Sequence, residues 1–234
     1  MLTMFHAVKG GSGTTVTTAL TALAHRGPTL LVDLDDELPA ALGVGGTDRP
    51  GVVDWLGSDA PLDHLSDLMV EVNTSTSMLT TRLDAGAAGS AAARLEASTT
   101  RWMQLSSWCR SWATRSGGRV FVDAGTQPLP QEFVAACDQR LLVTRSCYLA
   151  LREASRRSLS STGVVVVREP GRTLTDHDIA TSVGAPVSAS LTWEPAIARS
   201  VDAGLLTSRR VGRSTSRELR RLLRSHVLAE SIAA

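Results

Sequence analysis

The sequence predicts an α/β protein with a mostly parallel central sheet and helices on both faces. Short runs of β-branched and aliphatic residues alternate with longer stretches that suit helices. A glycine-rich turn joins the first strand directly to the first helix. The 234 residues are enough for one sizeable core, and nothing in the length demands a second, so we expect a single domain over residues 1–234.

The first half of the chain carries three expected strands. They lie at residues 2–8, 28–35 and 76–83, and the second is a continuous apolar run that ends in acids. A helix over 14–26 follows the glycine turn, with Val16, Leu20 and Leu23 at helical spacing. The other expected elements are two short helices at 51–59 and 60–70, a flexible turn at 86–90 and an Ala-rich helix at 90–115.

The second half repeats the alternation. Four more strands are expected, at 118–125, 139–146, 162–171 and 185–193, with helical links at 131–137 and 148–160. A C-terminal helix over 212–234 opens at a Ser/Thr cap and carries an apolar stripe through Leu219, Leu222, Leu223 and Val227. Packing of this stripe on the body is expected, with a membrane-targeting role as the alternative. We expect Trp102, Trp108 and Trp112 to pack on the sheet.

Composition excludes several classes of protein. With 43% hydrophobic residues, 20% charged residues and a net charge of +1, the chain is neither disordered nor strongly attracted to nucleic acid. The odd number of cysteines, Cys109, Cys137 and Cys147, and their wide spacing favour buried thiols over disulfides. Neither a signal peptide nor a run of 18 apolar residues is found, so a cytoplasmic location is expected. The five histidines have no ligand spacing.

The turn "KGGSGTT" (9–15) is the most informative stretch. Gly10, Gly11 and Gly13 allow the backbone to approach an anion, and the following helix adds a positive N-terminal dipole. Lys9 is the only lysine of the chain, whose 24 basic residues are otherwise arginine. A compact ammonium on a flexible stem is therefore indicated at this position.

Acidic residues end the buried strands at the same edge of the expected sheet. Asp33 and Asp35 close one strand and Asp123 closes another, and the carboxyl ends of parallel strands lie beside the glycine turn. Acids in this position can hold the hydration shell of Mg²⁺ or orient a water, whereas purely structural acids would cap the next helix.

These motifs resemble those of the deviant Walker A ATPases typified by MinD and ParA, which are P-loop NTPases. "KGGSGTT" is similar to their "KGGxGKT" loop, "LLVDLD" to their second-strand motif and "VFVDAG" to their Walker B strand. The stretch from 164 to 204 is similar to their late segment, which ends in a turn and a closing helix. The resemblance covers nearly the whole chain and implies their three-layer α/β/α fold.

The resemblance also implies a role for each matching residue. Lys9 would reach the phosphates of ATP held by a partner subunit, and Asp35 would orient the hydrolytic water. Thr15, Asp33 and Asp123 would hold Mg²⁺, partly through water. The residues that would cradle phosphate are Gly10, Gly11, Ser12, Gly13, Thr14 and Thr15. The base would lie near Arg168 and the turn from Trp193 to Pro195.

The sequence departs from the family at Thr14, where relatives carry a lysine that bridges the β- and γ-phosphates. A neutral hydroxyl donates a weaker hydrogen bond than an ammonium, which would weaken nucleotide binding about five- to thirtyfold. The resemblance implies an ATP-dependent homodimer that works with an activating or cargo protein in partitioning, division, or pilus or secretion placement. The arginine cluster at 209–224 would contact DNA, or form a solvated helix face. Thr14 also permits a scaffold that keeps the fold and hydrolyses nothing; a ligase or kinase lacks a substrate motif.

Overall fold

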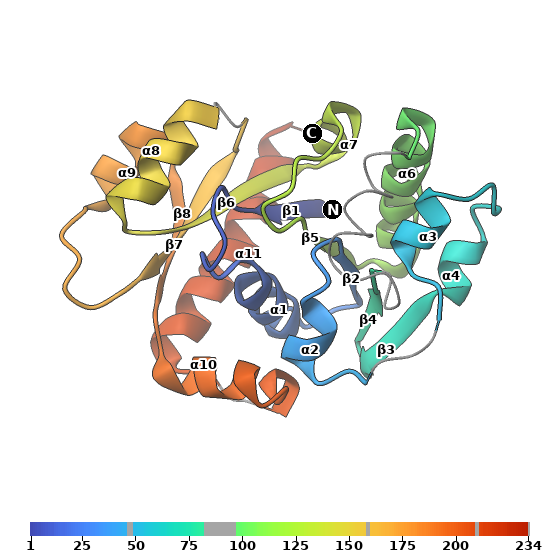
Figure 1. The fold of residues 1–234 in the computed structure, drawn as a ribbon, viewed down its shortest axis with the longest axis horizontal. Helices are drawn as coiled ribbons and strands as arrows, with labels where there is room; N and C mark the ends of the chain where they lie inside the picture. Colours follow the sequence, from blue (N-terminus) through green and yellow to red (C-terminus); the bar gives the residue numbers. More distant parts are fainter. Residues whose placement is uncertain (46–48, 82–96, 158–159, 209–210, 234) are drawn as a thin grey trace.

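A sheet of eight strands forms the centre of the described chain. The computed structural model describes residues 1–45, 49–81, 97–157, 160–208 and 211–233, with side chains as far as residue 224. The strand order is β3-β4-β2-β5-β1-β6-β7-β8, and every pairing is parallel except that of β3 with β4 (Figure 1). The strands are β1 (Leu2–His6), β2 (Thr29–Asp33), β3 (Met69–Asn73), β4 (Thr76–Leu79), β5 (Arg119–Asp123), β6 (Gln139–Arg145), β7 (Gly163–Arg168) and β8 (Val187–Thr192).

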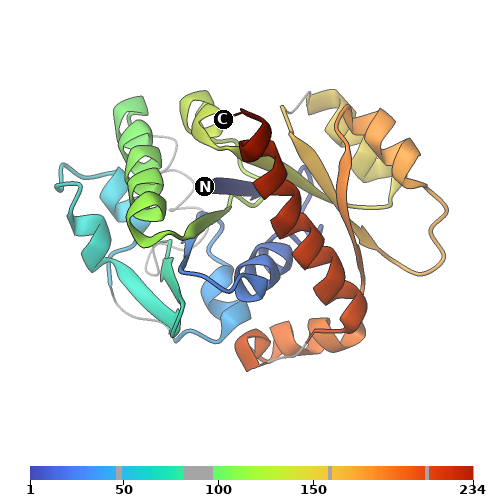
Figure 2. The ribbon, with the colours of Figure 1, turned by 180° about the vertical axis from the view of Figure 1, so that it is seen from behind.

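One face of the sheet carries the helix that follows the glycine turn. Phe5, Leu31 and Phe121 of the sheet share a buried cluster with Leu20 and Leu219 on this face. The longest helix of the described chain crosses the sheet diagonally here, as Figure 2 shows. The helices of this face are α1 (Thr14–Ala24), α2 (Leu38–Leu42), α10 (Pro195–Asp202) and α11 (Arg213–Ala233).

The opposite face is covered by two groups of helices. Leu30, Val32 and Val122 pack with Trp102 and Phe133 in one cluster, while β7 and its helices form a smaller one. The first group is α3 (Val52–Leu56), α4 (His64–Asp67), α6 (Thr99–Ser116) and α7 (Gln131–Ala136). The second is α8 (Tyr148–Arg157) and α9 (Asp176–Val183). The expected three-layer α/β/α arrangement is therefore confirmed.

Several local expectations need correction. Residues 69 and 70, expected at the end of a short helix, begin β3, which pairs antiparallel with β4 through a tight turn. The helix expected over 90–115 begins only at Thr99, because the Ser98 hydroxyl accepts the Arg101 amide as an N-cap. Helix α9, which was not expected, has a capping box between Thr175 and Asp178. The turn at 86–90 and residues 90–96 lie outside the described residues.

The expectations for tryptophans and thiols are largely confirmed. Trp102 and Trp108 are buried on the sheet, and Trp112 is partly buried against the same cluster. Cys109 and Cys137 are buried, and burial raises the pKa of the Cys137 thiol to about 12. Cys147 is the exception, because it is partly exposed just before α8.

The described part of the C-terminal helix packs on the body as expected. Leu219 and Leu222 are fully buried, and Leu223 is nearly so. The Arg119 guanidinium donates to the Leu223 carbonyl over 2.9 Å, which ties the helix to the start of β5. Val227 and the residues after it have side chains outside the described set. Among the helices that the structure describes, none combines the length and apolar character needed to cross a bilayer.

Candidate functional site

The turn between β1 and α1 has the backbone of an anion-binding loop. Gly11 and Gly13 lie in the left-handed region, with φ of 72° and 92°, which favours glycine. The Ser12 hydroxyl donates to the Lys9 carbonyl over 2.7 Å and closes the turn. Gly13 offers α1 no side-chain cap, so the first amides of the helix are available to a ligand.

Helix α1 is built from buried threonines. All of its threonines are buried: Thr14, Thr15, Thr17, Thr18 and Thr21. Two of them donate hydrogen bonds from their hydroxyls to carbonyls of the preceding turn. Thr18 donates to the Thr14 carbonyl over 2.9 Å, and Thr21 donates to the Thr17 carbonyl over 2.7 Å. These polar side chains are thereby satisfied inside the core cluster that α1 shares with the sheet.

Two carboxyl groups lie side by side beneath the loop. Asp33 and Asp123 are register neighbours at the ends of the adjacent strands β2 and β5, and both are fully buried. Asp33 Oδ1 accepts the amides of Asp35 and Asp36, while Asp123 Oδ1 accepts that of Gly125. Within the described residues, Oδ2 of each aspartate is buried without a hydrogen-bond partner. These two oxygens therefore have unmet hydrogen-bonding capacity in the interior.

Burial makes both carboxyl groups hard to ionise. Loss of solvation raises the pKa of Asp123 to about 7, and the nearby polar Thr15 hydroxyl opposes that rise. The pKa of Asp33 is raised well above its usual value, first by burial and then by the neighbouring Asp123. A positive charge at this position would restore the ionised forms.

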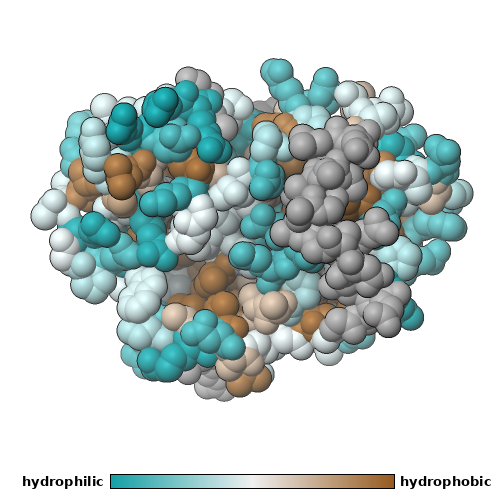
Figure 3. Space-filling model, in the orientation of Figure 1, coloured by the Kyte–Doolittle hydropathy of each residue, from teal (hydrophilic) through white to brown (hydrophobic). Residues whose placement is uncertain are grey.

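A cavity of about 640 Å³ opens above these acids. Its walls include the whole of the loop from Lys9 to Thr15, together with Asp35. A Cβ placed on Gly125 would lie 2.0 Å from the Asp35 carboxyl, so this glycine allows the carboxyl its position. The volume lies within the usual range for small-molecule sites. Hydrophobic surface is exposed in a hollow beside α10 on this face of the molecule (Figure 3).

The structure brings most of the expected residues together at this cavity. Lys9, the glycine loop, Thr15 and Asp35 line it, whereas Asp33 and Asp123 are fully buried and are not among its lining residues in the described chain. Arg168 and Pro195, expected near a nucleotide base, are not among its lining residues in the described chain. The Arg168 guanidinium is instead held by the Leu174 carbonyl and the Asp176 carboxylate, and Pro195 begins α10. Of the expected late turn, Trp193 does line the cavity.

Three parts of the cavity were not expected from the sequence. Glu37 accepts the Thr15 hydroxyl over 3.0 Å, and Arg145 enters from the end of β6. The acidic run "DLDDE" and the position of Arg145 at a strand end were the available signals. An apolar wall is the third part, formed by Val167, Leu191, Trp193, Ile197 and Val201.

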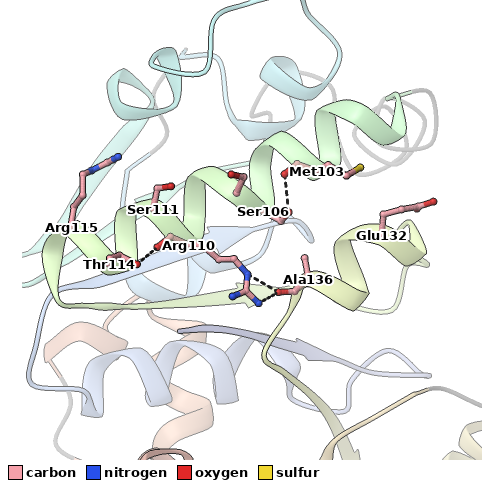
Figure 4. A pocket seen from close by; sticks show the side chains of 9 residues that line it. Met103, Ser106, Arg110, Ser111, Thr114, Arg115, Glu132 and Ala136 are labelled. Atoms are coloured by element: carbon pink, nitrogen blue, oxygen red, sulfur yellow. Dashed lines mark hydrogen bonds between the residues drawn. The ribbon is translucent and has the colours of Figure 1, made fainter. Parts of the chain in front are cut away.

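A second cavity lies between α6 and α7 and has a different character (Figure 4). Arg110 already donates to the Ala136 carbonyl and to Asp138, and Glu132 points along α7 away from the arginine (Figure 4). Met103 is exposed at one end. Because the arginine at the centre of this cavity is already paired with protein groups, the cavity at the glycine loop is the stronger candidate for the functional site.

Within the described residues, no group of three or more His, Cys, Asp or Glu side chains is arranged to hold a metal ion. A cation at the loop would therefore need ligands from a bound phosphate, from water or from the Thr15 hydroxyl as well.

Comparison with known proteins found likeness at the level of fold. No protein-family model and no curated protein matches the sequence. Among solved structures, a ParA family ATPase from Chlorobium tepidum TLS is 16% identical, with 96% of this chain and 98% of that one covered and a TM-score of 0.74. MinD from Pyrococcus horikoshii OT3, solved with Mg-ADP, is 18% identical over 100% and 99% of the two chains, also at 0.74. MinD in the MinC:MinD complex of Aquifex aeolicus is 18% identical over 97% and 96%, at 0.74. The chain thus has the fold of MinD and ParA ATPases.

Proposed function

We propose that this chain, folded like the MinD and ParA ATPases, binds ATP with Mg²⁺ at the glycine loop. Binding closes two copies into a dimer, and slow or partner-stimulated hydrolysis releases them. The observation that carries the proposal is that the left-handed glycine loop lines one cavity together with Thr15 and Asp35, while the buried Asp123 lies close to Thr15. The MinD structure with Mg-ADP supports nucleotide and metal as the ligands.

The loop is suited to phosphate. A Cβ on Gly10 or Gly11 would meet no atom within 4 Å, so the loop faces open space that an anion can fill. Gly10, Gly11, Ser12, Gly13 and Thr14 present backbone amides to phosphate oxygens, and the dipole of α1 adds positive potential. The apolar wall of the cavity, which includes Trp193, is suited to the flat face of a base.

The residues below the loop fit Mg²⁺. The two unpartnered oxygens of Asp33 and Asp123 are buried where a cation would be stabilised, and Thr15 offers a neutral oxygen ligand. The ion, when bound, neutralises charge on the phosphates during transfer. Thr15 ligates it directly in this proposal, and the two aspartates hold its water ligands. Glu37, which now accepts the Thr15 hydroxyl, would be released to a water or retained beside the metal.

Asp35 is the residue proposed to orient the hydrolytic water. Its carboxyl lies against Gly125, at the start of the loop that follows β5, and it lines the cavity. The backbone bond from the Ala7 amide to the Gly125 carbonyl, 2.8 Å long, fixes that loop to the end of β1. Asp35 is thereby positioned relative to the phosphate loop by a short chain of contacts.

Lys9 is the residue proposed to connect nucleotide to dimerisation. It is exposed at the rim of the cavity. Backbone hydrogen bonds from Ala150 and Leu149 lower the pKa of the Cys147 thiol before α8, and the charge of Lys9 adds to that lowering. Tyr148 and Leu149, the first residues of α8, are 70% and 57% exposed. This surface, a lysine beside exposed apolar side chains, is where a second copy would contact the chain and receive Lys9 at its phosphates.

The cellular task proposed is placement of a cargo, such as a chromosome, a plasmid, the division site, or a pilus or secretion apparatus, together with an activating or cargo protein. The MinC:MinD structure supports a protein partner. Arg220, Arg221 and Arg224 remain exposed on α11, which supports a contact with an acidic surface such as DNA; a peripheral membrane contact belongs to the same proposal. The location proposed is the cytoplasm.

Thr14 favours a second candidate, a scaffold that binds nucleotide without hydrolysing it. Thr14 contributes one hydroxyl and no charge at the position of the Walker A lysine, where negative charge develops during transfer. Phosphate release from the parent and from Thr14→Lys separates the two functions. Release by the parent supports the ATPase, and release by Thr14→Lys alone supports the scaffold.

Light scattering with Mg-ATP and Mg-ADP tests the main proposal. We expect a doubling of mass with ATP in the parent and none with ADP. Lys9→Ala should stay monomeric in ATP, while the matched variant Lys9→Arg should dimerise weakly because it keeps the charge but not the compact ammonium. Dimerisation of Lys9→Ala at the parent's level would refute the role of this lysine.

A further inference from the structure

The candidate site has few positive charges for a polyphosphate ligand. Among the described residues that line the cavity, Lys9 and Arg145 are the basic ones, while Asp35, Glu37, Glu194 and Asp202 are acidic. Thr14 adds no charge, and Asp33 and Asp123 lie beneath the loop. Lys9 is exposed at the rim and is proposed above to act on the partner's nucleotide. Within one subunit, Arg145 is therefore the lining residue that can bring a positive charge to its own ligand.

The position of Arg145 in the sheet brings it close to the loop. It is the last residue of β6, which lies next to β1, and in the parallel register it pairs with Val167 of β7. A methyl group of Val167 lies 3.6 Å from the place that a Cβ on Gly13 would occupy. The register partner of Arg145 on the neighbouring strand, Val167, therefore lies close to Gly13, the N-cap of α1.

The side chain of Arg145 also lies on the appropriate face. Leu141 and Val143, which precede it at alternate positions in β6, are buried in the cluster that contains Leu20 of α1. Side chains at alternate strand positions share a face, so Arg145 is on the side of the sheet where α1 begins. This is the side on which the loop presents its amides.

The Arg145 guanidinium is held by Glu169 but has donors that are not used in hydrogen bonds within the described residues. Its Nη1 donates to Glu169 Oε1 over 2.6 Å, which is the hydrogen bond it makes within the described residues, and its Nε is buried without a partner. The side chain is 40% exposed, so its other nitrogen can reach the cavity. Glu169 is also bound by Arg172, with 3.1 Å between Arg172 Nη2 and Glu169 Oε2. Glu169 therefore keeps a cationic partner if Arg145 turns toward a ligand.

We propose that Arg145 supplies to the bound phosphates the positive charge that the loop lacks at Thr14. This inference rests on the proposed nucleotide site and assigns the residue that makes it work without the Walker A lysine. A guanidinium is well matched to phosphate because its donors form paired hydrogen bonds with two oxygens. The charge reaches the phosphates from β6 instead of from the first turn of α1.

Isothermal titration of Mg-ATP into the nucleotide-free chain and its variants tests the inference through affinity alone. We expect Arg145→Met to bind at least about tenfold more weakly than the parent, because it loses a charged hydrogen bond. Arg145→Lys should retain part of the affinity. The matched control is Arg172→Met, which removes the other arginine on Glu169 and should bind within about twofold of the parent.

A rescue variant separates loss of charge from loss of folding. Thr14→Lys with Arg145→Met places an ammonium on the loop and should recover the affinity lost by Arg145→Met alone, whereas a misfolded site would not recover. Parent-like binding by Arg145→Met overturns the inference and leaves the proposed function intact. Equal weakening by Arg145→Met and Arg172→Met also overturns it, because the effect would then come from Glu169. A parent that binds no Mg-ATP at millimolar concentration overturns both proposals.

Discussion

Replacing Asp123 with asparagine should stabilise the nucleotide-free protein in alkaline solution. Burial raises the native pKa of this carboxyl to about 7 from its ordinary value of 3.8. A raised native pKa means that the stability present below the unfolded pKa is lost as the pH rises through the native pKa. At 1.36 kcal/mol per unit, the loss is about 4 kcal/mol, of which about 3 kcal/mol falls between pH 5 and pH 9.

The asparagine variant has no charge to bury, so its unfolding free energy should lack this component. A new cost comes from its amide hydrogens, which need an acceptor, and is about 1–3 kcal/mol. That cost is the same at both pH values and cancels in the difference between them. Measured by urea unfolding in the absence of Mg²⁺, the parent should therefore lose about 3 kcal/mol more than Asp123→Asn between pH 5 and pH 9.

Glu71→Gln is the control, because it removes a carboxyl from an exposed position of β3. Its pH dependence should follow that of the parent closely. The reasoning is refuted if the curves of the parent and Asp123→Asn run parallel to within about 1 kcal/mol, since the carboxyl would then be equally easy to ionise in the native and unfolded states.

Three other predictions concern stability and the geometry of the site. Burial lowers the pKa of His6 to about 4 from 6.5, so the free energy of unfolding should fall by about 3 kcal/mol as the pH falls from 6.5 to 4. Unfolding of His6→Gln should lack this loss, and equal acid sensitivity of the two proteins would contradict the prediction. Gly125→Ala and Gly171→Ala both place alanine at positive φ, but only the methyl group of Gly125→Ala would meet the Asp35 carboxyl. Gly125→Ala should therefore reduce phosphate release and Gly171→Ala should not; equal release by the two variants would rule out the clash. Leu222→Ala should destabilise the chain by about 2–5 kcal/mol and the half-exposed Leu205→Ala by much less, whereas similar small effects would show that α11 is not part of the core.

Much of the fold follows from the sequence because buried parallel strands are continuous apolar runs between glycine turns. β2 and β7 are of this kind, and each lies within its expected range. β3 was missed since its side chains are only partly buried and it lies at the sheet edge, where no continuous apolar run is required. α9 was missed because it buries mainly Ile179, so its apolar periodicity is weak.

The candidate site was predictable where it depends on strand ends and unpredictable where it depends on side-chain direction. Asp33 and Asp123 could be paired from topology alone, since both close strands at one sheet edge. The orientation of the Arg168 side chain depends on the loop after β7, which brings Asp176 against its guanidinium. No pattern in one sequence specifies that contact. The places of Arg145 and Glu37 in the site likewise follow only from the three-dimensional structure, in which both line the cavity.

The threonine-rich composition of α1 makes the order of the glycine loop depend on the folding of the whole domain. β-Branched residues are poor helix formers, and α1 has neither a side-chain N-cap nor acids in its first turn. An isolated peptide of this segment would be a random coil, so the helix dipole and the ordered amides arise only when α1 docks on the finished sheet. Ligand affinity and cooperative folding are then thermodynamically linked, and a bound ligand at a hundred times its dissociation constant would raise the free energy of unfolding by about 2.7 kcal/mol. A newly made chain would present the ordered amides of the loop only once α1 has docked on the sheet.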